Sequence, residues 1–88
     1  LFQLKRYAEA AELLKKASDL VKDDVVIRMH YGDALVETGD KTGAIEAYRN
    51  ALDAAERSLV PEEIEKIETL RKKLVRLGVS LSTEGEAK

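Results

Sequence analysis

His30 is the only histidine in the chain, and it is the residue best suited by type to acid–base chemistry. A histidine can take a proton from a serine or cysteine nucleophile during catalysis. No recognisable motif places such a nucleophile, and the chain contains no cysteine. We therefore expect His30 to be a partly exposed helix residue, and the sequence predicts no catalytic residue and no enzyme activity.

Two carboxylates, Asp33 and Glu37, lie four residues apart, so they share one face of a helix at a spacing that metal ligands also use. Because no histidine or cysteine motif accompanies them, we assign them no metal. The adjacent acids Asp23 and Asp24 suit helix capping better than calcium binding, since no loop of alternating oxygen ligands follows. The sequence thus predicts neither a metal nor a cofactor.

Near the C-terminus the sequence contains a basic cluster: Arg71, Lys72, Lys73 and Arg76. The cluster has no interleaved aromatic residues, and the acids Glu62, Glu63, Glu65 and Glu68 precede it. Acids at the start of a helix and bases at its end complement the helix dipole. This pattern favours a solvated helix over a nucleic-acid surface.

Composition narrows the function classes further. The 88 residues include 15 basic and 17 acidic ones, for a net charge of −2. This balance gives no electrostatic reason to bind nucleic acid or an anionic membrane. No apolar run approaches the roughly 18 residues that membrane insertion requires. We expect a cytoplasmic location and, because the chain starts at Leu1 rather than Met, a missing natural N-terminus.

Helix signals divide the chain clearly. Gly39 and Gly78 follow apolar helical stretches and predict helix ends, whereas Asp24, Asp40 and Pro61 predict helix starts. Apolar residues recur at helical spacing between these marks. We predict a helix ending near residue 5 and helices over about 7–22, 24–38, 41–57 and 61–77. Residues 79–88 are expected to be disordered.

The chain also contains an internal repeat. Ala10 and Ala44 are 34 residues apart, as are Ala17 and Ala51, and Leu14 falls on Tyr48. A period of 34 residues is that of the tetratricopeptide repeat. The segment 25–58 resembles one full copy of it, through the residues Tyr31, Gly32, Leu35, Gly39, Ala44, Tyr48 and Ala51.

Departures from the family pattern occur at Arg28, where tryptophan is usual, and at Glu56, where proline is common. The resemblance implies an all-α fold of antiparallel helix-turn-helix repeats, stacked as a right-handed α-solenoid. It divides the chain into a partial repeat over 1–24, a complete repeat over 25–58, a capping helix over 59–78 and a tail over 79–88. Within the partial repeat, the resemblance implies a turn at residues 5–7. Gly32 and Ala44 have almost no side chain, so the paired helices can approach closely there.

The resemblance also implies a binding surface, because the first helix of each pair lines the concave face of such a solenoid. The expected surface consists of Val26, Met29, Asp33, Val36 and Glu37. This strip suits an apolar or amphipathic segment with a basic residue. The chaperone C-terminal carboxylate that some family members bind is not expected, because Asp33 would repel it.

We therefore expect a protein–protein interaction module, a scaffold or adaptor segment of a larger protein, whose partner the sequence does not identify. Two alternatives stay open. One is self-association through an exposed apolar end at Leu1, Phe2 and Leu4. The other is a non-catalytic regulatory module of a larger enzyme.

Overall fold

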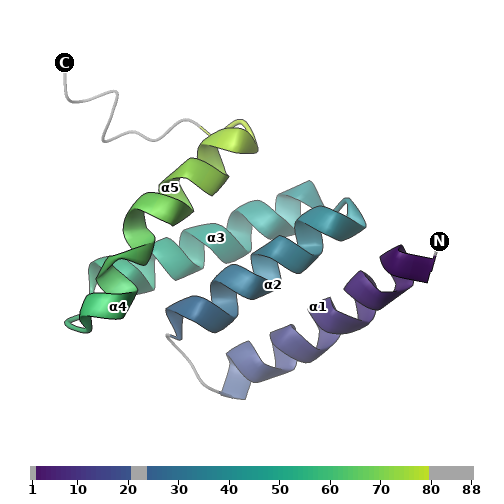
Figure 1. Ribbon diagram of the computed structural model, residues 1–88, viewed down its shortest axis with the longest axis horizontal. Helices are drawn as coiled ribbons and strands as arrows, with labels where there is room; N and C mark the ends of the chain where they lie inside the picture. Colours follow the sequence, from purple (N-terminus) through teal and green to yellow (C-terminus); the bar gives the residue numbers. More distant parts are fainter. Residues whose placement is uncertain (1, 21–23, 80–88) are drawn as a thin grey trace.

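The computed structural model describes the backbone of residues 2–20 and 24–79, and the side chains of residues 6–20 and 24–79. The helices are α1 (Phe2–Leu20), α2 (Val25–Thr38), α3 (Lys41–Glu56), α4 (Pro61–Ile64) and α5 (Lys66–Arg76). Figure 1 shows α2 between α1 and α3, with α5 against α3. The expected all-α helical-repeat fold is confirmed, and the described residues contain no strand.

Capping interactions define both ends of α2 and the start of α3. The Asp24 carboxylate accepts a hydrogen bond of 3.0 Å from the Ile27 amide, and Asp40 accepts one of 2.9 Å from the Gly43 amide. Between the two helices, Gly39 adopts φ 88°, a left-handed conformation that glycine takes without a steric penalty. The predicted turn between α2 and α3 is therefore confirmed, and it reverses the chain within two residues.

Small residues set the close approach of α2 and α3. Ala44 and Ala51 are fully buried, and the Tyr48 ring is 2% exposed. A Cβ atom added to Gly32 would lie 2.6 Å from Cε1 of Tyr48, so no larger residue fits without displacing the ring. The expected role of Gly32 in helix approach is confirmed. Leu35 belongs to the same buried core, and Tyr31 packs half-buried against it.

The C-terminal helical region packs against α3, which also packs against α2. Leu70 and Leu74 are fully buried, and Ile67 and Leu77 pack against the same core. One helix was expected over 61–77, but the structure contains the short α4 and the longer α5, separated at Glu65. Glu65 keeps a right-handed helical backbone (φ −61°, ψ −24°), so the interruption is local.

The expected turn at residues 5–7 is wrong. The helix α1 runs without interruption from Phe2 to Leu20. The physical reason is that residues 2–17 contain no glycine, proline, asparagine or aspartate, and most are good helix formers. Nothing in this stretch therefore favours a helix break.

The last described residue, Val79, also differs from expectation. It was placed in a disordered tail, but its amide donates a 3.0 Å hydrogen bond to the Leu74 carbonyl, and its side chain packs against the core. The rest of that predicted tail, 80–88, lies outside the described residues. No helix in the described part of the chain is long and apolar enough to cross a membrane.

Candidate functional site

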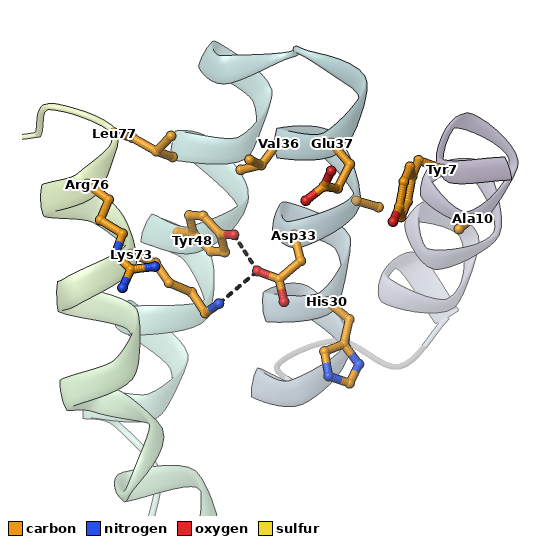
Figure 2. A pocket seen from close by; sticks show the side chains of 11 residues that line it. Tyr7, Ala10, His30, Asp33, Val36, Glu37, Tyr48, Lys73, Arg76 and Leu77 are labelled. Carbon is orange, nitrogen blue, oxygen red and sulfur yellow. Dashed lines mark hydrogen bonds and ion pairs between the residues drawn. The ribbon is translucent and has the colours of Figure 1, made fainter. Parts of the chain in front are cut away.

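A groove of about 570 Å³ lies on one side of α2, between α1 and α5. Figure 2 shows α2 along its centre, with side chains reaching in from α1 and α5. The lining residues are Tyr7 and Ala10 from α1; His30, Asp33, Ala34, Val36 and Glu37 from α2; Tyr48 from α3; and Lys73, Arg76 and Leu77 from α5. Residues from the two ends of the chain thus meet at one surface.

Asp33 is the centre of a polar network in this groove. Its carboxylate accepts a hydrogen bond from the Tyr48 hydroxyl and forms an ion pair of 3.0 Å with the Lys73 ammonium (Figure 2). The Lys73 nitrogen also lies 5.8 Å from the centre of the Tyr48 ring, within range of a cation–π interaction. This network connects α2, α3 and α5, so it fixes the α5 side of the groove relative to α2.

Burial and the neighbouring carboxylate change the chemistry of Tyr48. Burial raises the pKa of the Tyr48 hydroxyl well above its ordinary value of 10, and the hydrogen bond to Asp33 raises it further. The carboxylates of Asp33 and Glu37 act in the same direction, because a negative charge disfavours the phenolate. Tyr48 therefore stays protonated and remains a hydrogen-bond donor to Asp33 at neutral pH.

The five residues expected on the concave surface have different positions in the structure. Val36, Glu37 and Asp33 line the groove. Val26 is half-buried and does not line it. The placement of Met29 on an open surface is wrong, because its side chain is 8% exposed and belongs to the core.

The reason for the Met29 error is the position of α2 between two neighbours. Because α1 and α3 both pack against it, α2 buries more than one face. Val25, Met29 and Gly32 follow helical spacing along one buried face, and Ala34 and Leu35 extend the buried surface further. The apolar pattern of the sequence does not show which apolar residues face a neighbouring helix.

The sequence did not predict which residues of α1, α3 and α5 line the groove. Tyr7 was expected in the turn at residues 5–7 and Leu77 at the end of the predicted helix 61–77. Lys73 and Arg76 were recognised as part of a basic cluster, but nothing in the sequence places them beside α2. His30 was expected to be exposed on its helix, and it is exposed and lines the groove.

In the basic cluster on α5, Arg71 and Lys73 form ion pairs within the chain, whereas Lys72 and Arg76 face solvent. Arg71 forms an ion pair with Glu56 at 3.5 Å, with both side chains more than a third exposed, and Lys73 pairs with Asp33. Lys72 and Arg76 are exposed. Although His30, Asp33 and Glu37 line one groove, the described residues contain no cluster of three or more His, Cys, Asp or Glu side chains that could hold a metal ion.

A second, more polar hollow lies on the other side of α2. Its lining includes Arg28 and Tyr31 from α2, Lys15 from α1, and Glu46 and Asn50 from α3. Glu46 and Asn50 are exposed, and neither lines the groove. They are therefore suitable control positions for binding experiments on the groove.

Comparison with known proteins agrees with the helical repeat. A family model described as tetratricopeptide repeat matches residues 1–60, which include α1, α2 and α3. No curated protein and no solved structure is similar enough to this chain to count as a match. Because the matched region is well over half of the 88 residues and coincides with the stacked helices, the chain belongs to the tetratricopeptide repeat family.

Proposed function

We propose that this chain is a protein–protein interaction module that binds a segment of a partner protein in the groove between α1, α2 and α5. Tetratricopeptide repeats generally mediate interactions between proteins. The observation that carries the proposal is the groove itself, which presents exposed apolar and charged side chains from separate helices on one surface. Its volume of about 570 Å³ suits several side chains of a bound segment.

Two features of the groove support recognition of a polypeptide. Val36 is 38% exposed and Tyr7 is 37% exposed, so both have apolar surface that a ligand can bury. Hydrogen-bonding and charged side chains border these apolar residues, an arrangement that gives a binding surface specificity. The Asp33 network holds the α5 side of the groove against α2 and α3, which lowers the entropic cost of ordering that side on binding.

The experiment starts from short random peptides displayed on phage and selected for binding to the full chain. Affinities of the selected peptides are then measured by fluorescence anisotropy for the wild type and for the groove variants Val36→Ala and His30→Ala. The matched controls are Glu46→Ala and Asn50→Ala on the other side of α2. We expect the groove variants to bind roughly tenfold more weakly, a change of about 1.4 kcal/mol, and the controls to bind as the wild type does.

Equal binding by the groove variants and the wild type would contradict the proposal. Met29→Ala is unsuitable for this experiment, because Met29 is in the core and its truncation would change stability. Circular dichroism of each variant verifies that helix content is retained.

A second candidate function is self-association, favoured by exposed leucines on α1. Leu13 is 67% exposed and Leu20 is 84% exposed, and their spacing of seven residues places them on one stripe of the helix. The residues first expected to mediate it lie outside the described part: Leu1 altogether, and Phe2 and Leu4 in their side chains. Multi-angle light scattering of the wild type and of the Leu13→Ser/Leu20→Ser variant tests this candidate, and a wild type that stays monomeric at high concentration would exclude it.

A further inference from the structure

Two opposite charges on opposite sides of the groove have no bond to other described residues. Glu37 extends from α2 and Arg76 from α5, and both are exposed. No hydrogen bond or ion pair joins either side chain to another residue in the ranges 6–20 and 24–79. Both are therefore available to a ligand.

The other pair of charges in the groove is already used. Asp33 binds Lys73 at 3.0 Å and also accepts the Tyr48 hydrogen bond. A ligand charge that displaced this pair would have to break an existing network that joins three helices. Asp33 is therefore not free to pair with a ligand, and Glu37 and Arg76 are the charges that can set the charge preference of the groove.

An apolar surface lies between these two charges. Figure 2 shows Val36 and Leu77 at one end of the groove, Glu37 beside Tyr7 on the α1 side, and Arg76 on the α5 side. An apolar ligand side chain that contacts Val36 would have a cationic wall on one side and an anionic wall on the other. A ligand of uniform charge would be attracted by one wall and repelled by the other.

We infer that the groove selects a partner segment with one carboxylate side chain and one basic side chain flanking an apolar residue, and that the order of these charges sets the direction in which the segment lies. The carboxylate pairs with Arg76 and the basic side chain with Glu37. This inference rests on the proposed function and specifies its ligand. Reversing the segment would bring like charges together at both walls, which is how charged interfaces reject incorrect partners.

The test uses the selected peptide that binds most tightly and a synthetic counterpart in which its acidic and basic residues exchange places. The two peptides have the same composition and net charge, so a difference in affinity reports charge order alone. Fluorescence anisotropy is measured with the wild-type full chain and with the charge-reversed Glu37→Arg/Arg76→Glu variant. Both substitutions are at exposed positions, and thermal melting verifies that the variant is folded.

An exposed ion pair is worth up to about fivefold in affinity, and the selected peptide forms two such pairs. The wild type is therefore expected to prefer the selected peptide by roughly three- to tenfold. The charge-reversed variant is expected to prefer the exchanged peptide. Both preferences should weaken when NaCl is raised from about 0.05 M to about 0.5 M, because exposed charges are screened.

The result separates this inference from the proposed function. If Val36→Ala weakens binding but the two peptides bind equally well, the charge-order inference is overturned and the groove remains the binding site. Selected peptides that contain charges of only one sign would overturn it as well. If Val36→Ala has no effect on any selected peptide, the proposed function itself fails.

Discussion

The carboxylate of Asp33 on α2 accepts a hydrogen bond from the hydroxyl of Tyr48 on α3, on the same side of the helix pair as the groove. The Tyr48 ring packs in the core against Gly32, whereas its hydroxyl reaches the polar network. One residue thus connects the packing of the repeat with the shape of its candidate binding surface. Changes to either end of Tyr48 are therefore expected to affect both stability and binding.

Replacing Asp33 by alanine should lower the free energy of unfolding by about 1–3 kcal/mol, because the Tyr48 hydroxyl loses its acceptor in a largely buried position. Urea denaturation followed by circular dichroism measures the change. The Glu37→Ala variant is the control, because Glu37 is exposed on the same helix, and it should change stability by less than about 0.5 kcal/mol.

A double-mutant cycle with Tyr48→Phe isolates the hydrogen bond. Asp33→Ala should cost less in the Tyr48→Phe background than in the wild type, since the hydroxyl is then absent. Equal costs in the two backgrounds would show that the hydrogen bond does not contribute to stability.

Stability should fall at alkaline pH because of Tyr48. Its pKa is raised in the folded chain, so the folded state keeps this proton at a pH where the unfolded state loses it. The contribution is fully present below the ordinary tyrosine pKa of 10 and is lost as the pH rises above it. The advantage of wild type over Tyr48→Phe should shrink by about 1 kcal/mol by pH 11.

The measurement is urea denaturation of wild type and Tyr48→Phe at several pH values between about 8 and about 11. The phenylalanine variant retains the ring and all other titrating groups, so it is the matched reference. A stability difference that does not change across this range would contradict the raised pKa.

Gly32→Ala should destabilise the chain despite alanine's higher helix propensity. The new Cβ would lie 2.6 Å and 2.7 Å from two carbons of the Tyr48 ring, so the ring or the helix must move. Overpacking of this kind costs about 1–3 kcal/mol. Alanine gains at most about 1 kcal/mol over glycine in helix propensity, so the overpacking cost should be the larger of the two. Thermal melting measures the net loss.

Gly32→Ala in a Tyr48→Leu background provides the control, because leucine has no ring at this position. In that background Gly32→Ala should lower the melting temperature less than it does in the wild type, which would assign the loss of stability to the contact with the Tyr48 ring. The hypothesis is wrong if Gly32→Ala raises the melting temperature of the wild type.

The packing of α5 should contribute much of the stability of the chain. Leu74 is fully buried, whereas its neighbour Val75 is 50% exposed. We expect Leu74→Ala to cost about 2–5 kcal/mol and Val75→Ala to cost less than about 1 kcal/mol. Chemical denaturation of both variants measures these values, and similar losses would show that α5 does not pack as a buried cap.

Leu74→Ala should also weaken peptide binding in the groove, because α5 supplies one wall through Arg76 and Leu77. Val75→Ala serves as the control in this assay too, since Val75 does not line the groove. Unchanged binding by a folded Leu74→Ala variant would indicate that the α5 wall is not needed.

The sequence by itself determined the repeat and most of the helix boundaries. Asp24, Asp40 and Pro61 mark helix starts, and Gly39 marks an end, through interactions that reach only a few residues along the chain. The spacing of small residues such as Gly32 and Ala44 was enough to predict where two helices approach closely. The missed continuity of α1 at residues 5–7 came from applying the family pattern where no helix-breaking residue is present.

Only the tertiary structure decided which residues form the candidate site. Whether Met29 faces the core or the solvent depends on how two other helices pack around α2, and periodicity along one helix does not specify this. Lys73 reaches Asp33 from 40 residues away and changes it from a free acid into the centre of a network. The tertiary structure also brings Glu37 and Arg76 to the same groove. The packing of α5 against α3 places Arg76 beside the surface that α2 lines.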